Sequence, residues 1–223
     1  MTGLRQGRPR RHTLVFDLDG TLLDSAPDIA EALNALFRDL SLPPVGLDLI
    51  RTMIGDGAPV LLARALVHVG SDLKAEDLMP RYLVHYDANA TGKTIVYPTV
   101  IETLAALREA GCRLGVCTNK PIGATRIVLK AYGFDPLIEA VIGGDSLPQR
   151  KPAPEPLLHI IRALDGTTGD AVLIGDSAVD VACARAAGVP CIVLPSGYGT
   201  EPPQAEIIAE RFADLPRIIE ALP

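Results

Sequence analysis

The chain has 223 residues, of which 48% are apolar and 22% are charged, and its formal net charge is −6. This composition is globular, leaves no room for wholesale disorder, and suits one substantial domain or one domain that carries an insertion. Outside the start of the chain the basic residues do not cluster, and no apolar run is long enough to span a bilayer, so neither a nucleic-acid partner nor a membrane partner is expected.

The first segment in chain order is a basic arm, residues 1–11, which carries four arginines and no apolar stretch behind them. This pattern does not fit a secretory signal, and we expect a solvated, disordered tail. The four cysteines lack the spacing of a metal site or a disulfide framework, which indicates buried thiols and a cytoplasmic protein. The four histidines likewise have no mutual spacing suited to a metal.

Five continuous apolar runs have the length of strands: Thr13–Phe16, Arg113–Cys117, Ala140–Ile142, Ala171–Ile174 and Cys191–Leu194. Continuous rather than alternating hydrophobicity is typical of parallel strands that are covered on both faces. Helical patterns lie between them, with a capping box expected at Thr99 and Glu102 and closing glycines at 111, 133 and 188. This rhythm predicts an α/β fold with a doubly wound, Rossmann-like parallel sheet.

The rhythm breaks between the first and second strands. Three amphipathic stripes occur there, over residues 29–40, 60–69 and 78–86, without any strand-like run. We therefore expect a small α-helical cap domain, residues 24–93, inserted into an α/β core domain made of residues 12–23 and 94–223. The linkers are expected near residues 22–25 and 90–97.

The first strand ends in a pair of acidic residues. Asp17 and Asp19 are two residues apart, so on an extended chain their carboxyl groups point to the same side, and Gly20 permits a sharp turn after them. Two adjacent carboxylates repel each other unless a cation or a proton lies between them. The pair therefore indicates a bound metal or a shared proton, with an acidic surface turn as the alternative.

Polar residues also follow the later strands. Thr118 and Asn119 suit phosphate oxygens, Lys151 sits in a proline-rich turn before a helix, and Asp176 and Asp180 follow the fourth strand. Singly, these residues also suit helix caps, an exposed lysine and a solvated first turn. Jointly, they stand at the carboxyl ends of parallel strands, where such sheets bind ligands, and hard oxygen donors favour Mg²⁺.

The chain resembles the haloacid dehalogenase-like hydrolases in four motifs that occur in order: 17–22 (DLDGTL), Thr118-Asn119, Lys151-Pro152, and 175–177 (GDS) with Asp180. In closer detail it is similar to the bacterial phosphoglycolate phosphatases within that family. The stretches that carry this second resemblance are 24–28, 54–59, 143–148 and 197–199. The resemblance implies a Mg²⁺-dependent phosphatase that acts on a small phosphorylated metabolite, with 2-phosphoglycolate as the expected substrate, and a monomer or homodimer.

Carried over by motif, the resemblance makes Asp17 the nucleophile that forms an aspartyl-phosphate, and Asp19 the general acid and base. It implies that Mg²⁺ is held by the Asp17 carboxylate, the Asp19 backbone carbonyl and the Asp176 carboxylate, with Asp180 in support. The transferring phosphoryl group is expected on Thr118, Asn119 and Lys151. The apolar pair Ala178-Val179 stands where many relatives have polar residues.

The cap is expected to recognise the rest of the substrate. Gly55, Asp56 and Gly57 could form a backbone nest for its carboxylate, with Arg51 or Arg64 as the cation. The alternative is that both arginines are solvated and that the glycines only make a turn. Two further functions remain open: a phosphosugar phosphatase or mutase on the same scaffold, and a signalling receiver that is phosphorylated on aspartate.

Overall fold

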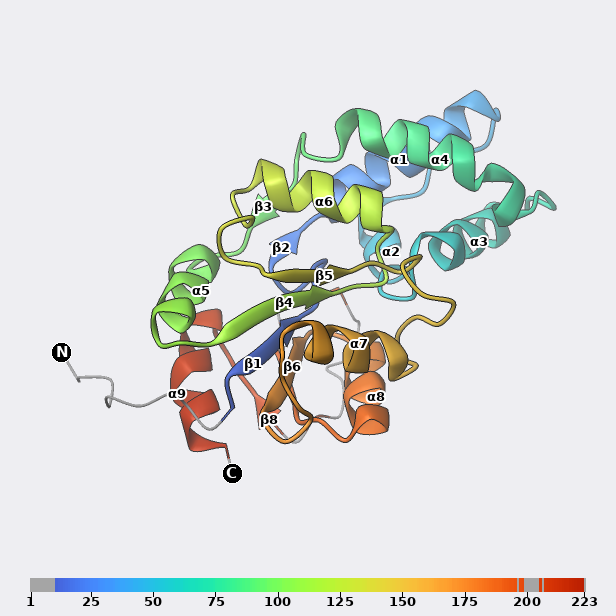
Figure 1. Cartoon of the computed structure of the whole chain (residues 1–223). Coiled ribbons are helices and arrows are strands. Elements are labelled where there is room, and N and C mark those ends of the chain that lie inside the picture. The colour runs from blue at the N-terminus through green and yellow to red at the C-terminus, as the bar shows by residue number, and fades with distance from the viewer. Residues whose placement is uncertain (1–10, 196, 199–204, 206, 223) are drawn as a thin grey trace.

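The computed structural model describes residues 11–195, 197, 198, 205 and 207–222. Within these residues a six-stranded sheet has the order β5-β4-β1-β6-β7-β8, and every neighbouring pair is parallel. Its strands are β1 (Thr13–Phe16), β4 (Arg113–Cys117), β5 (Ala140–Ile142), β6 (Ala171–Gly175), β7 (Cys191–Val193) and β8 (Ile207–Ile208). The predicted α/β class with a parallel sheet is confirmed (Figure 1).

Helices cover both faces of the sheet, which explains the continuous hydrophobicity of its strands. Along β1, Val15 belongs to an apolar cluster with α7 (Glu155–Ala163) and α8 (Ala178–Ala187). Leu14 and Phe16 point to the other face, into a cluster with α5 (Val100–Glu109), α6 (Ile122–Ala131) and α9 (Leu215–Ala221). This alternation between two buried faces is the period of an extended chain, and it makes the sheet doubly wound.

Three of the predicted strands, β1, β4 and β5, have the predicted bounds, whereas β6 is one residue longer and β7 one shorter than expected. The capping box at Thr99 is wrong: the Thr99 backbone is left-handed, with φ of 65°, and its side chain makes no cap hydrogen bond to α5. The glycines 111, 133 and 188 do adopt positive φ at helix ends. The expected basic arm lies outside the described residues except for Arg11, and so does Gly199.

Four helices lie between residues 25 and 90: α1 (Ala26–Asp39), α2 (Leu47–Arg51), α3 (Ala58–His68) and α4 (Ala75–Asn89). We call residues 26–89 the helical block. It lies over one end of the sheet in Figure 1, and α4 packs against both α1 and α3. The division into a cap domain, 24–93, and a core domain stays a prediction. No described helix is long and apolar enough to cross a membrane.

A small antiparallel ribbon stands at the base of the helical block, where the sequence pattern predicts only linkers. It pairs β2 (Leu23–Asp24) with β3 (Ile95–Val96). The buried Asp28 carboxylate ties the returning chain to α1, because it accepts hydrogen bonds from Lys93 N and Thr94 N at 2.8 Å each and from Thr94 Oγ1 at 2.6 Å. The two chain crossings are therefore fastened to each other.

Candidate active site

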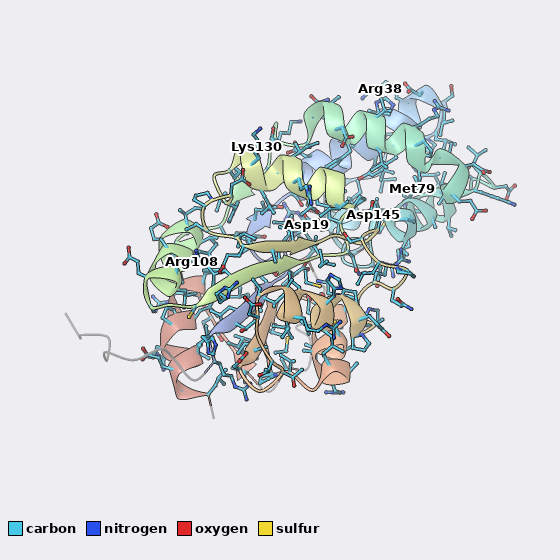
Figure 2. The ribbon with its side chains drawn as sticks, in the orientation of Figure 1. Asp19, Arg38, Met79, Arg108, Lys130 and Asp145 are labelled. Atoms are coloured by element: carbon cyan, nitrogen blue, oxygen red, sulfur yellow. The ribbon has the colours of Figure 1, made fainter. Side chains whose placement is uncertain are left out.

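The topology brings three of the sequence motifs to one edge of the sheet. Strands β4, β1 and β6 are neighbours, and Thr118, Asp17 and Asp176 follow their carboxyl ends. A pocket opens between this edge and the helical block, and Asp19 in Figure 2 lies near this junction, away from Arg38 and Met79 of the block. The pocket is lined by Asp17, Asp19, Ile29, Ile54, Gly55, Gly57, Ala58, Leu61, Tyr82, Leu83, Tyr86, Thr118, Asn119, Lys120, Pro121 and Ala124.

Asp17 and Lys151 form a buried ion pair beneath the pocket. Lys151 Nζ lies 3.0 Å from Asp17 Oδ1 and donates a hydrogen bond of 2.6 Å to Asp180 Oδ1. Burial raises the pKa of Asp17 to about 6, against the opposing charge of Lys151. Burial also opposes the charge of Lys151, but Asp17 and Asp180 together raise its pKa well above the ordinary value, so this ammonium stays protonated. The lysine is thus a fixed positive charge next to Asp17.

Asp176 is held by the loop that follows β1 and by the backbone near the end of the chain. Thr21 Oγ1 donates a 2.8 Å hydrogen bond to Asp176 Oδ1, and Tyr198 N lies 3.3 Å from Asp176 Oδ2 as a donor. A Cβ on Gly20 would come within 2.4 Å of Asp176 Oδ2, and a Cβ on Gly197 within 2.0 Å, so both positions need glycine. Burial, then the charges of Asp17 and Asp180, raise the pKa of Asp176 well above its ordinary value.

Carboxylate oxygens of Asp17, Asp176 and Asp180 lie within 4.8 Å of one another, in a cluster that could hold a metal ion. The Lys151 ammonium pairs with two of these carboxylates, Asp17 and Asp180, and the buried Asp17 Oδ1 has no hydrogen-bond partner. Excess negative charge on hard oxygen atoms suits a divalent cation. The residues present therefore fit a divalent metal.

Both carboxylate oxygens of Asp180 already have hydrogen-bond donors within the protein. Its Oδ1 accepts from Lys151, and its Oδ2 accepts from both the backbone N–H and the hydroxyl of Ser177. Ser177, and not Asp176, caps α8 and forms a capping box with Asp180. The alternative that Asp180 is solvated on the first helical turn is wrong, because its side chain is fully buried.

Asp19 has two partners that the sequence analysis did not single out. Its carboxylate accepts hydrogen bonds from Ser25 Oγ and from Lys120 Nζ, which lies 3.0 Å from Oδ1 and 3.1 Å from Oδ2. Lys120 is 7% exposed, and its Nζ also lies 4.6 Å from the ring centroid of Tyr86 on α4. The signal for Lys120 was its place directly after Thr118-Asn119 at a strand end.

Thr118 and Asn119 are both buried and both line the pocket. The Asn119 side-chain amide donates to the backbone oxygens of Gly55 and Lys151, at 3.0 and 2.9 Å, while its Oδ1 has no partner. Asn119 therefore joins the sheet edge, the Lys151 turn and the helical block at one point, and presents an unused acceptor there.

The candidate residues for carboxylate recognition separate into two groups. Gly55 and Gly57 have positive φ and line the pocket. Asp56 instead pairs with Arg64, at 2.6 Å, and Arg51 donates to Asp24 Oδ2 at 2.9 Å. Neither arginine is among the described residues that line the pocket, and each pairs with an aspartate. A backbone nest at Gly55 and Gly57 stays a prediction.

Tyr198 lies in the stretch 197–199 that the sequence comparison marks, but its side-chain role was not predicted. Its hydroxyl donates to Asp24 Oδ1 at 3.0 Å and accepts from Ser25 N at 2.7 Å and Ala26 N at 3.1 Å. Its backbone N–H points to Asp176. One residue thus joins the acidic cluster to the start of the helical block.

Comparisons with known proteins agree with this geometry. The model of the haloacid dehalogenase-like hydrolase family matches residues 12–188. A phosphoglycolate phosphatase of Rhodospirillum rubrum is 41% identical over 85% of this chain and 81% of its own length. One of Caulobacter vibrioides is 40% identical over 92% of this chain and 89% of its own.

A solved structure gives the same result. The crystal structure of a protein described as a predicted phosphoglycolate phosphatase from Haemophilus somnus superposes with a TM-score of 0.89 at 33% sequence identity. It covers 95% of this chain and 99% of that one. On the sequence motifs, the sheet, the site at its edge and these matches, the chain belongs to the haloacid dehalogenase-like hydrolases.

Proposed function

We propose that this protein is a Mg²⁺-dependent phosphatase that hydrolyses 2-phosphoglycolate to glycolate and inorganic phosphate. The observation that carries the proposal is the meeting of Asp17, Asp19, Thr118 and Asn119 in one pocket, with Lys151 Nζ 3.0 Å from Asp17. The substrate follows from the relatives, which are named phosphoglycolate phosphatases and are 41% and 40% identical to this chain over 81% and 89% of their own lengths. The hydrolase family match favours this function over the signalling receiver.

In the first step a carboxylate oxygen of Asp17 attacks phosphorus, and the bond from phosphorus to the ester oxygen breaks. Asp19 gives its proton to that ester oxygen, so glycolate leaves as an alcohol. The Thr118 hydroxyl, the backbone N–H of Asn119 and Lys151 hold the phosphoryl oxygens, since both side-chain N–H groups of Asn119 already donate within the protein. The ammonium of Lys151 offsets the charge of these oxygens as the anionic nucleophile approaches. The product of this step on the enzyme is an aspartyl-phosphate at Asp17.

In the second step Asp19, now a carboxylate, takes a proton from a water molecule that attacks the aspartyl-phosphate. The bond between phosphorus and the Asp17 oxygen breaks, and phosphate and the Asp17 carboxylate are regenerated. The Asp17 carboxylate, the Asp19 backbone carbonyl and the Asp176 carboxylate would hold Mg²⁺, which supplies positive charge for the anionic phosphoryl group. Asp180 keeps Lys151 in place through both steps.

The expected setting is a reducing cytoplasm, in keeping with four cysteines of which three are buried. The expected partner is a small phosphorylated metabolite. A monomer and a homodimer both remain compatible with the chain.

The test is phosphate release from a panel of phosphorylated metabolites with and without Mg²⁺. We expect 2-phosphoglycolate to have the highest kcat/KM, EDTA to abolish turnover, and Asp17→Asn to lose it entirely. Asp19→Asn should bind substrate but lose most of kcat, since only the proton transfer is removed. A preference for a hexose phosphate that is converted to an isomer without free phosphate would instead identify a mutase.

A further inference from the structure

The pocket wall beyond the reacting groups is largely apolar, and this limits what can recognise a second anion. Its apolar members come from both the helical block and α6: Ile29, Ile54, Ala58, Leu61, Leu83 and Ala124. Among the described residues that line the pocket, Lys120 is the only one with a positive charge. Arg51 and Arg64 are paired elsewhere, and Lys151 lies behind Asp17.

Lys120 keeps donor capacity free toward the pocket. Its ammonium has three N–H groups, and the two oxygens of Asp19, at 3.0 and 3.1 Å, are its hydrogen-bond acceptors. The face of Tyr86, 4.6 Å away, attracts the cation but takes no full hydrogen bond. At least one N–H is therefore available to an anion that enters beside Asp19.

Tyr86 supplies a second unused donor at the same place. Its side chain is 2% exposed, it lines the pocket, and its hydroxyl meets no hydrogen-bond acceptor among the described residues. A buried hydroxyl without an acceptor is uncommon, because each such group loses its hydrogen bond to water on folding. The hydroxyl comes from α4 of the helical block, whereas Lys120 follows β4 of the sheet.

We propose that the Lys120 ammonium and the Tyr86 hydroxyl form the subsite for the carboxylate of the substrate. The assignment rests on the proposed function, in which Asp19 protonates the ester oxygen of 2-phosphoglycolate. The carboxyl carbon lies two bonds beyond that oxygen, so the carboxylate falls next to Asp19, where Lys120 already sits. The subsite takes small phosphate monoesters whose anionic group lies two bonds beyond the ester oxygen, and it needs both Tyr86 from α4 and Lys120 from the loop after β4.

The experiment compares two substrates, 2-phosphoglycolate and ethyl phosphate, which lacks the carboxylate. The measured quantity is the ratio of their kcat/KM values in wild type, Lys120→Met and Tyr86→Phe. We expect the ratio to fall about 100-fold in Lys120→Met, as on loss of one partner of a buried charge pair, and about tenfold in Tyr86→Phe. The matched control is Lys93→Met, which removes the same charge from an exposed pair with Glu31 and should keep the wild-type ratio.

If kcat/KM falls by the same factor for both substrates in Lys120→Met and Tyr86→Phe, the subsite is overturned. That result would mean that the two side chains only support Asp19 and the pocket wall. Tyr86→Phe keeps the ring against Lys120, so it remains informative if Lys120→Met does not fold. Failure of the proposed function is distinct from both results. It is seen in the wild type, as a kcat/KM for 2-phosphoglycolate no higher than that for ethyl phosphate.

Discussion

Replacing Thr21 by valine tests the role of Asp176 without touching the pocket. Thr21 is 1% exposed and donates 2.8 Å to Asp176 Oδ1, and valine has nearly the same shape without the hydroxyl. A hydrogen bond to a charged group contributes about 1.5–3 kcal/mol, and 1.4 kcal/mol corresponds to a tenfold change in an equilibrium constant. Loss of a residue that orients a metal ligand costs about 10–100-fold in metal affinity. The two magnitudes agree.

We therefore expect the Mg²⁺ concentration for half-maximal phosphate release to rise about 10–100-fold in Thr21→Val, with most of kcat restored at saturating Mg²⁺. Thr21→Ser keeps the hydroxyl and should recover most of the affinity. Thr103→Val removes a buried threonine hydroxyl from α5, outside the pocket, and serves as the control. An unchanged Mg²⁺ dependence in Thr21→Val would show that Asp176 does not act through the metal.

Three further predictions concern the charge of Asp17, the close packing of Gly20 against Asp176, and the hydrogen bonds of Asp28 at the base of the helical block. Burial raises the pKa of Asp17 from 3.8 to about 6. Between these two pH values the folded metal-free protein therefore still carries a proton on Asp17 that the unfolded chain has lost. Its stability should therefore fall as the pH rises from about 4 to about 6, and the rise in Tm caused by Mg²⁺ should be larger at pH 7.5 than at pH 5; equal rises would contradict this. Gly20 has a φ of 90°, and a Cβ at this position would lie 2.4 Å from Asp176 Oδ2, so Gly20→Ala should lower kcat/KM at least tenfold. Near-normal phosphate release by this variant would refute the close approach. Asp28→Ala leaves the hydrogen-bond donors of Lys93 and Thr94 without an acceptor, so we expect a loss of about 3 kcal/mol of stability and a Tm lower by about 6–12 °C in a thermal melt. A fall in Tm of less than about 2 °C would contradict this prediction.

The sheet could be predicted because its strands are continuous apolar runs whose burial on both faces is a local property of the sequence. The two-residue strands β2, β3 and β8 and the five-residue helix α2 could not, since elements this short carry no periodicity and exist only through their tertiary partners. Thr99 failed as a cap for a related reason. Its backbone takes a left-handed turn that the residue types at 99 and 102 do not reveal.

The site divides in the same way. Asp17, Asp19, Thr118 and Asn119 follow directly from strand ends, so parallel topology alone places them in one pocket. Ion pairs depend on distances in space, so the sequence did not show that Arg51 and Arg64 pair with aspartates outside the pocket lining, whereas Lys120 pairs with Asp19 and lines the pocket. Tyr86 comes from a segment outside every motif, and Tyr198 from the stretch 197–199, but the roles of both depend on how the helical block packs against the rest of the chain.

The double attachment of Tyr198 limits how this enzyme can be re-engineered. Its backbone N–H donates to Asp176 of the acidic cluster, and its hydroxyl forms hydrogen bonds with Asp24, Ser25 and Ala26. The helical block is therefore not an interchangeable module. A chimera that grafts a foreign block onto this sheet must carry over those three positions as its splice point. A graft that begins after Ala26 keeps all the hydrogen bonds of the Tyr198 hydroxyl, whereas one that begins before Asp24 leaves Tyr198 only its backbone contact with Asp176.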